Sequence, residues 1–313
     1  MTNQIPSDAA SLKRLGQKLS NWGRWGPDDE IGTLNFVTPE VRVAAARLVV
    51  TGKVFDLGMP IGKGGPFDVP GLPRFNPIHL MTVTPQDALA HDQHTADDVI
   101  IMGLQSATQW DGLAHAGYGG RLYNDVPVTA VNTRSGATRV SFAAVVDCFI
   151  SRGVLLDIAR LHGTAVLAES TDITADDLSA SEEMAGVKVR SGDILLVRTG
   201  FYQHFLNGDH ARFMGAEPGL GVSTLEWLHD REVAAVALDN WACEVMPSPL
   251  PDYTLPFHMV AMRDMGMTIG EMFDLEALAA DCAEDGVYEF LFSGTGLKIA
   301  NAVGSPVTPM AIK

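Results

Sequence analysis

Four side chains that could bind a cation or move a proton lie within eleven residues of one another. They are Gln105, Gln109, Asp111 and His115, in the segment QSATQWDGLAHAGYGG. Carboxylate and amide oxygens suit hard divalent ions, while imidazole binds borderline ions or serves as a general base. The combination predicts a site for Mn²⁺, Mg²⁺ or Zn²⁺. Taken alone it is weak evidence, because an Asp and a His four residues apart also occur together by chance.

Two local structures could gather these side chains. In a helix, Asp111 and His115 would share one face because they are four residues apart. In a strand, Gln105, Gln109 and Asp111 would point the same way because their numbers differ by even steps. Gly112 would then permit a turn that brings His115 back toward Asp111. The residues themselves leave both arrangements open, and glutamines more often make structural hydrogen bonds than bind metal.

The segment QSATQWDGLAH resembles the signature HxGTHxDxPxH of the cyclase family, which includes bacterial kynurenine formamidases and isatin hydrolases. Thr108, Asp111 and His115 match the signature, whereas Gln105 and Gln109 stand where it has histidines. The pattern TQWDGLAH, together with NWGRWGPDDEIGTLN near the start, resembles a distinct branch of this family. The resemblance runs from about Trp22 to the C-terminus.

A second match lies downstream, in PFHMVAMRDMGMTIGEMFDLEAL. The family carries a His about a dozen residues before a Glu, and His258 and Glu271 occupy these places. A lone histidine is more often an ordinary hydrogen-bonded residue, so the agreement of the two segments carries the inference. The resemblance implies that Asp111 anchors a divalent ion, with His258, Glu271 and the amide oxygen of Gln109 as further ligands.

The implied reaction is hydrolysis of an amide, lactone or cyclic imide carbonyl in a small molecule. His115 would act as the general base toward water and then as the acid toward the leaving group. Amide oxygens in place of two imidazoles favour Mn²⁺ over Zn²⁺, with Mg²⁺ also possible. Two alternatives stay open. One is a metal-independent lyase or lactone-opening enzyme of the same fold, and the other is a non-catalytic small-molecule binder that has lost the side chains that would bind metal.

Three other residues are candidates for the surroundings of the site. Glu244, in the segment DNWACEVMP, lies where related chains approach the metal. Trp25 and Trp110 could wall a substrate pocket, since indole covers a large apolar area, or could simply pack the core.

The elements that position these residues show the mixed pattern of an α/β protein. Helices are expected near 8–19, after Pro39, at 174–186 and at 223–231. Strands are expected at 79–84, 98–105, 152–159, 193–200 and 233–240. No linker divides the chain, so one domain over 1–313 is expected, with the first ~20 residues as a peripheral helix or arm. The family resemblance implies a swivelling β/β/α arrangement, a mixed barrel-like sheet flanked by helices.

Composition excludes several classes of partner. The formal net charge of −16 disfavours nucleic acid and anionic membrane surfaces, and no run of 18 apolar residues predicts a membrane span. Three scattered cysteines and the absence of a secretory signal predict a cytoplasmic protein. The resemblance implies a homo-oligomer, a dimer or tetramer, and the Gly/Pro-rich segment 60–78 is a candidate contact.

Overall fold

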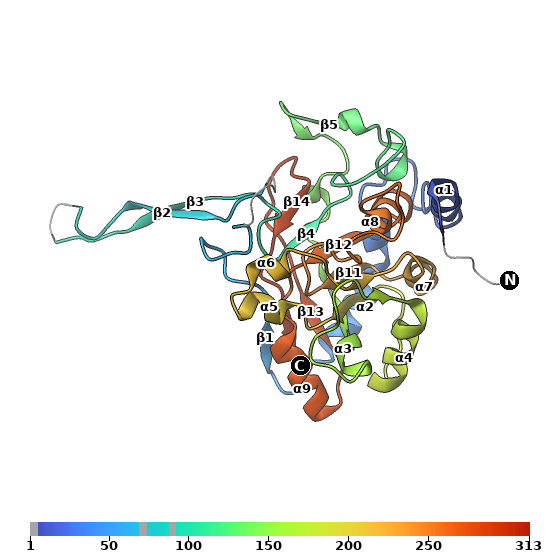
Figure 1. Cartoon of the computed structure of the whole chain (residues 1–313). Helices are drawn as coiled ribbons and strands as arrows, with labels where there is room; N and C mark the ends of the chain where they lie inside the picture. Colours follow the sequence, from blue (N-terminus) through green and yellow to red (C-terminus); the bar gives the residue numbers. More distant parts are fainter. Residues whose placement is uncertain (1–5, 69–73, 88–91) are drawn as a thin grey trace.

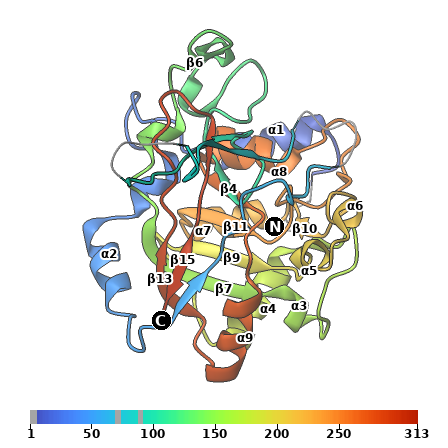
Figure 2. The same ribbon diagram turned by 90° about the vertical axis from the view of Figure 1, so that its left-hand side faces the viewer.

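The computed structural model describes residues 6–68, 74–87 and 92–313. A mixed sheet of nine strands curls into half a barrel at the centre of the described chain (Figures 1 and 2), as expected for the α/β class. In sheet order its strands are β1 (Val54–Asp56), β15 (Met310–Ile312), β13 (Glu289–Ser293), β7 (Ile150–Asp157), β9 (Ile194–Arg198), β11 (Ala235–Leu238), β12 (Thr268–Glu271), β4 (Gln109–Asp111) and β14 (Gly304–Pro306).

The middle of the sheet is parallel. β7, β9, β11 and β12 run in one direction, and antiparallel strands extend the sheet on both sides. β9 and β11 are buried along their whole length, which explains the apolar run ILLV that precedes Arg198 in β9 and the apolar sequence AVAL of β11. The strands expected at 152–159, 193–200 and 233–240 are therefore confirmed as β7, β9 and β11.

Helices surround the sheet. α3 (Ile158–Leu161) and α7 (Thr224–Asp230) both pack against α4 (Ala175–Ala185), while α9 (Glu276–Asp285) lies near the C-terminus (Figure 1). The α-helices are α1 (Ala9–Lys18), α2 (Pro39–Ala46), α3 (Ile158–Leu161), α4 (Ala175–Ala185), α5 (Tyr202–Leu206), α6 (His210–Phe213), α7 (Thr224–Asp230), α8 (Pro256–His258) and α9 (Glu276–Asp285). Short 3₁₀ turns are η1 (Gly32–Phe36), η2 (Tyr123–Asp125), η3 (Val128–Ala130) and η4 (Phe142–Ala144), and η5 (Met259–Met265) is a π-helix.

Local sequence signals account for the helix ends. Asp8 begins α1 and Thr174 begins α4, each through a capping box that satisfies free backbone N–H groups. Gly186 ends α4 in a left-handed conformation, with φ of 63°. The four expected helices are confirmed, although α2 stops at Ala46, earlier than its apolar sequence suggests. Of the helices in the described ranges, none combines the length and apolar character needed to cross a membrane.

Trp110 belongs to the core, so its prediction as a wall of the substrate pocket is wrong. Its ring is fully buried, stacks on Phe149 with centroids 4.7 Å apart, and donates from Nε1 to the carbonyl of Gly294. Gly270 on β12 makes room for it, because a Cβ there would lie 2.7 Å from the indole. In a strand Trp110 must face away from Gln109 and Asp111, so burying its ring directs these two side chains to the other face.

Three small two-stranded sheets stand apart from the main sheet: β8 (Asp172–Ile173) with β10 (Gly219–Leu220), β5 (Val131–Asn132) with β6 (Gly136–Ala137), and β2 (Ile78–Val83) with β3 (Asp97–Ile101). The last pair forms a hairpin that projects from the body (Figure 1). It confirms the strands expected at 79–84 and 98–105. Within the segment 60–78, residues 69–73 lie outside the described ranges.

Candidate metal centre

Two adjacent antiparallel strands present the polar side chains of the site. Gln109 on β4 pairs directly with Glu271 on β12, and Asp111 pairs with Ile269 two positions along. Residues in register share a face of the sheet, so Gln109, Asp111 and Glu271 project together. The Nε2 of Gln109 donates a hydrogen bond to Oε2 of Glu271. The strand arrangement considered for this segment is thus the one observed, and the helical one is not.

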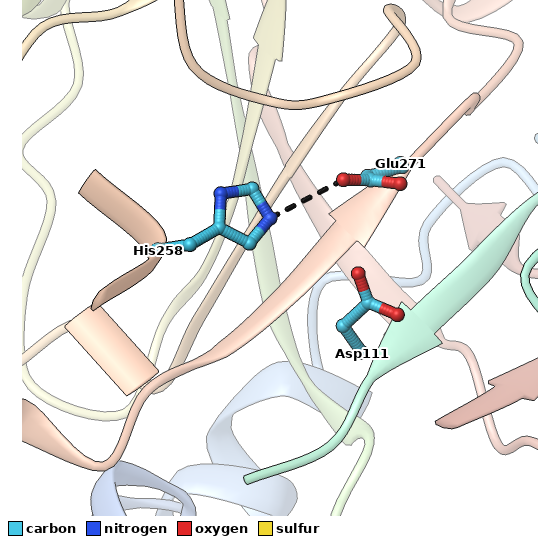
Figure 3. Close-up of side chains that lie close together, drawn as sticks. All are labelled: Asp111, His258 and Glu271. Atoms are coloured by element: carbon cyan, nitrogen blue, oxygen red, sulfur yellow. Dashed lines mark ion pairs between the residues drawn. The ribbon is translucent and has the colours of Figure 1, made fainter. Parts of the chain in front are cut away.

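His258 completes the cluster from the opposite side. It ends α8, immediately before the π-helix η5, and its Nε2 lies 3.3 Å from Oε1 of Glu271. Figure 3 shows the side chains of Asp111, His258 and Glu271 turned toward a common point. One ligand atom from each lies within 4.8 Å of the others, and all three residues are buried. Two segments far apart in the sequence therefore meet at one site.

The donor set fits a divalent cation. Both carboxylate oxygens of Asp111 and the Oε1 of Gln109 are buried without a hydrogen-bond donor in the described part of the chain. A buried carboxylate without a partner costs several kcal/mol, so a cation is the natural counterpart for these oxygens. Burial, and after it the nearby charge of Asp111, raise the pKa of Glu271, while His258 and Arg74 act to lower it.

Glu244 orients His258. One of its oxygens accepts hydrogen bonds from the Nδ1 of His258 at 2.6 Å and from the backbone N–H of the same residue, and the other accepts from the N–H of Phe257. Burial acts to lower the pKa of His258, but the hydrogen bonds and charges of Glu244 and Glu271 outweigh it and raise this pKa to about 10. With Nδ1 bonded to Glu244, Nε2 is left facing the cluster.

We expect metal binding to release about one proton per ion at pH 7. His258 is protonated at this pH in the metal-free protein because its pKa lies near 10, and a metal must displace the proton on Nε2. The apparent affinity should therefore fall about tenfold for each pH unit below about 10. Calorimetric titration of Mn²⁺ in two buffers of different ionisation enthalpy measures the released protons directly. Identical heats in both buffers would contradict the prediction.

Replacing the carboxylate that orients His258 should weaken the site without removing a ligand. We expect Glu244→Gln to lower metal affinity by about 10- to 100-fold, because the amide cannot accept from all three donors. Glu217→Gln is a matched control, since Glu217 is equally buried and accepts two backbone N–H groups but makes no hydrogen bond to His258. Competition with a metal-binding dye measures both affinities. Equal values for the two variants would show that Glu244 does not position the ligand.

His115 lies beside the cluster. Its backbone N–H bonds to the carbonyl of Gly112, closing the turn that the glycine was expected to allow. The turn brings Nε2 of His115 to 3.6 Å from Oδ2 of Asp111, and the imidazole keeps about 23% of its surface exposed. His115 can therefore reach both Asp111 and solvent, whereas Asp111, His258 and Glu271 are sealed inside.

Two residues at the edge of the site were not anticipated from their sequence neighbourhood. Nη1 of Arg74 donates to the carbonyl of Gln105 and lies 4.0 Å from Oε2 of Glu271. Thr108 joins three segments: its hydroxyl donates to Met272 and accepts from the N–H of Met59, and its carbonyl accepts from Val307. The match of Thr108 to the family signature was the only sequence signal for this structural role.

Trp25 makes its observed ring contacts away from the cluster. The indole meets Phe36 edge-on with centroids 5.1 Å apart, and the guanidinium of Arg24 lies over the ring at 5.2 Å. These contacts hold the loop before η1 together. They provide no support for Trp25 as part of a substrate pocket, which stays a prediction.

Comparison with known proteins identifies the family. A family model described as "Putative cyclase" matches residues 55–245. A crystal structure described as that of a novel cyclase is 42% identical, with a TM-score of 0.88 over 95% of this chain and 99% of its own. No curated protein sequence gives a significant match.

More distant structures share the fold. Isatin hydrolase A from Ralstonia solanacearum is 20% identical, with a TM-score of 0.61 over 87% of this chain and 95% of its own. A predicted metal-dependent hydrolase from Bacillus stearothermophilus is 15% identical, with a TM-score of 0.52 over 84% and 98%. The family model covers most of the chain, and the 42% identical cyclase covers nearly all of it, so the chain belongs to the cyclase family.

Proposed function

We propose that the protein is a metal-dependent hydrolase that opens an amide, lactone or cyclic imide carbonyl of a small molecule. The observation that carries the proposal is the buried carboxylate of Asp111, which has no hydrogen-bond donor among the described residues and lies between His115 and the pair His258–Glu271. Isatin hydrolase and metal-dependent hydrolase structures with this fold add support.

The proposed ligands are Asp111, His258, Glu271 and the Oε1 of Gln109. Three of these four supply oxygen atoms, which favours Mn²⁺ or Mg²⁺ over Zn²⁺. When bound, such an ion would polarise the scissile carbonyl and make water more acidic. Glu244 would keep the Nε2 of His258 directed inward, and the hydrogen bond from Gln109 would hold Glu271 in place.

His115 is proposed to move the proton. Its Nε2 would take a proton from water as the oxygen attacks the carbonyl carbon, and Asp111, 3.6 Å away, would stabilise the resulting imidazolium. The same nitrogen would then return the proton to the leaving nitrogen or oxygen as the C–N or C–O bond breaks. The products are a carboxylic acid, which gives up its proton to the released amine or to solvent, and an amine, an amide or an alcohol, so His115 ends the cycle as it began.

We propose that two further side chains contact the substrate. The Nε2 of Gln105 is buried and has no acceptor in the described ranges, so it can donate to a substrate oxygen. Arg74 lies at the edge of the cluster with about 27% of its side chain exposed, where its charge would attract the carboxylate that hydrolysis forms.

The experiment that tests the function is a substrate screen on metal-free protein with and without added ion. N-formyl arylamines, lactones, cyclic amides and cyclic imides would each be assayed after chelation and again with Mn²⁺, Mg²⁺ or Zn²⁺. Turnover that disappears on chelation and returns with Mn²⁺ supports the proposal. Turnover that survives complete removal of metal would instead favour the metal-independent lyase or lactone-opening alternative, and binding without turnover would favour the non-catalytic binder.

A further inference from the structure

One cavity of the described chain involves none of the residues of the metal centre. It lies where α1 and the loop after it meet η5, and its volume of about 480 Å³ is in the range of small-molecule sites. We call it the α1 cavity. The side chains in its lining that could hold a ligand are Lys13, Trp22, Tyr118, Arg263 and Asp264.

Specific contacts fix the wall that α1 contributes. The helix packs against η5 (Figure 1), and Gly16 permits the close approach, because a Cβ there would lie 2.4 Å from Oδ2 of Asp264 and 2.7 Å from the hydroxyl of Tyr118. After the helix, Asn21 donates from its backbone N–H to the carbonyl of Asp264 and from its side-chain amide to that of Met265. The cavity is therefore a built part of the fold.

Arg263 is oriented by two aromatic rings. Its guanidinium carbon lies 4.5 Å from the ring centroid of Trp22 and 4.2 Å from that of Tyr118. Both rings are themselves anchored: the Nε1 of Trp22 donates to the carbonyl of Arg263 at 2.6 Å, and the hydroxyl of Tyr118 donates to Asp264 at 2.7 Å. Packing against ring faces leaves the N–H edges of the guanidinium for hydrogen bonds.

One edge of this guanidinium is not used by the protein. Nη1 of Arg263 donates to Oδ1 of Asp264, whereas Nε is buried and has no acceptor in the described part of the chain. A buried donor without an acceptor is unfavourable, so an oxygen supplied by a ligand is its natural partner. Nε lies on the edge that arginines use, together with Nη2, to bind a carboxylate through two parallel hydrogen bonds.

The charge at the cavity suits a ligand with a single negative charge. Asp264 balances Arg263 through their ion pair, while Lys13 is exposed on α1 and makes no ion pair with the described residues. One positive charge is therefore left, in a chain whose net charge is −16. A carboxylate would neutralise it, whereas a doubly charged phosphate would leave a negative charge that the rest of the protein repels.

The rest of the ligand is expected to be flat and apolar. The rings of Trp22 and Tyr118 line the cavity beside the guanidinium. Aromatic side chains bind another ring by offset stacking or by edge-to-face contact. A planar ring that carries a carboxylate would satisfy the rings and the charge together.

We propose that the α1 cavity is a second ligand site, which binds a small ring-bearing carboxylate through the guanidinium of Arg263 and the ammonium group of Lys13. The ligand would also contact segments that lead from the metal centre. Arg263 belongs to η5, which continues the helical run that His258 ends in α8, and Tyr118 follows the turn that carries His115. Binding at this site does not depend on the hydrolase assignment.

Calorimetric titration of benzoate into the full-length, metal-free protein tests the proposal. Metal is removed so that benzoate cannot bind to an ion. We expect one benzoate per chain with a Kd on the order of 1 mM, which is usual for so small a ligand. Benzamide has nearly the same shape without the charge and should bind at least about 10-fold more weakly. No binding of benzoate at up to ~20 mM would overturn the proposal.

Two variants test the cationic groups. Arg263→Gln should weaken benzoate binding by about 10-fold or more, and Lys13→Gln, at an exposed position that the fold does not need, by about 3-fold. Arg231→Gln is a matched control, because the guanidinium of Arg231 also lies over an indole, that of Trp227, and pairs with Glu182. It should keep the wild-type Kd. Equal affinities in the variants and the control would refute the site.

Hydrogen exchange on wild type locates the ligand without any variant. Benzoate should slow the exchange of amides in 13–22 and 259–264, and unchanged exchange in both segments would contradict the proposal. Binding that Arg74→Gln removes and Arg263→Gln leaves intact would place benzoate at the metal centre and would equally overturn it. All of these measurements use metal-free protein and need no turnover, so their outcome is separate from that of the hydrolase assignment.

Discussion

Asp111→Asn is expected to abolish metal binding and to lower kcat/KM by at least about 10³-fold, which corresponds to about 4 kcal/mol of transition-state stabilisation. Asp111 is the only proposed ligand whose two carboxylate oxygens both lack a hydrogen-bond donor among the described residues. No hydrogen bond within the described ranges of the metal-free protein depends on this carboxylate, so removing its charge should act on metal binding directly. Asparagine has almost the same shape, and any loss therefore reports the charge and not the packing.

The same variant has an opposite and measurable effect on stability. In the metal-free protein Asp111 adds negative charge beside Glu271, so Asp111→Asn should melt at the same temperature as metal-free wild type or higher. Wild type should gain about 4 kcal/mol at a free metal concentration 1,000 times its dissociation constant, and the variant should gain nothing.

Asp193→Asn is the matched control. Asp193 is also a buried carboxylate, but it pairs with Arg152 through two hydrogen bonds. Its replacement should lower the melting temperature with or without metal and should leave the metal content unchanged. Elemental analysis and thermal melts of the three proteins settle the comparison. Stoichiometric metal in Asp111→Asn would rule out Asp111 as the anchor of the site.

Sequence reasoning succeeded where periodicity and turn chemistry decide the structure. The even spacing of Gln109 and Asp111 predicted a shared face if the segment were a strand, one of the two arrangements left open, and the strand is the one observed. Gly112 allows the turn that brings back His115, as that arrangement required. The central strands β9 and β11 were detectable because burial on both faces demands continuous apolar sequence.

The two strands that carry the site were harder to detect. β4 and β12 have three and four residues, with the sequences QWD and TIGE, and neither shows an apolar run. Polar residues and a glycine occupy β4 and β12 for two reasons. One face of these strands carries the side chains of the metal cluster, and on the other face Gly270 leaves room for the ring of Trp110. The sequence signals for helices and strands are weakest at positions whose residues are needed for the chemistry of a site and not for packing in the core.

The direction of Trp110 could have been deduced from the sequence. If Asp111 faces the site from a strand, its neighbour must face the opposite side, and a large apolar ring there belongs to the core. Glu244 and Arg74 offered no such signal. They reach the cluster through loops whose paths depend on the assembled sheet, and only the resemblance to related chains pointed to Glu244.

His115→Ala is expected to lower kcat by about 10²- to 10⁴-fold while leaving metal content unchanged. The imidazole touches Asp111 but is separate from the group Asp111, His258 and Glu271, so its loss should remove proton transfer and keep the ion. His115→Ala should therefore lose activity and keep the metal, whereas Asp111→Asn should lose both activity and metal. Because His115 is partly exposed, added imidazole should enter the vacated space and restore part of the rate.

His162→Ala provides the control, because His162 is also partly exposed and pairs with a carboxylate, Asp177, on the outer helices. It should keep the wild-type kcat and show no response to imidazole. Steady-state kinetics on metal-loaded proteins would then give a three-way comparison. An unchanged kcat in His115→Ala would assign the proton transfer to another group, and loss of metal would make His115 a ligand. Only a general-base role for His115 predicts that added imidazole restores the rate of His115→Ala while its metal content stays complete.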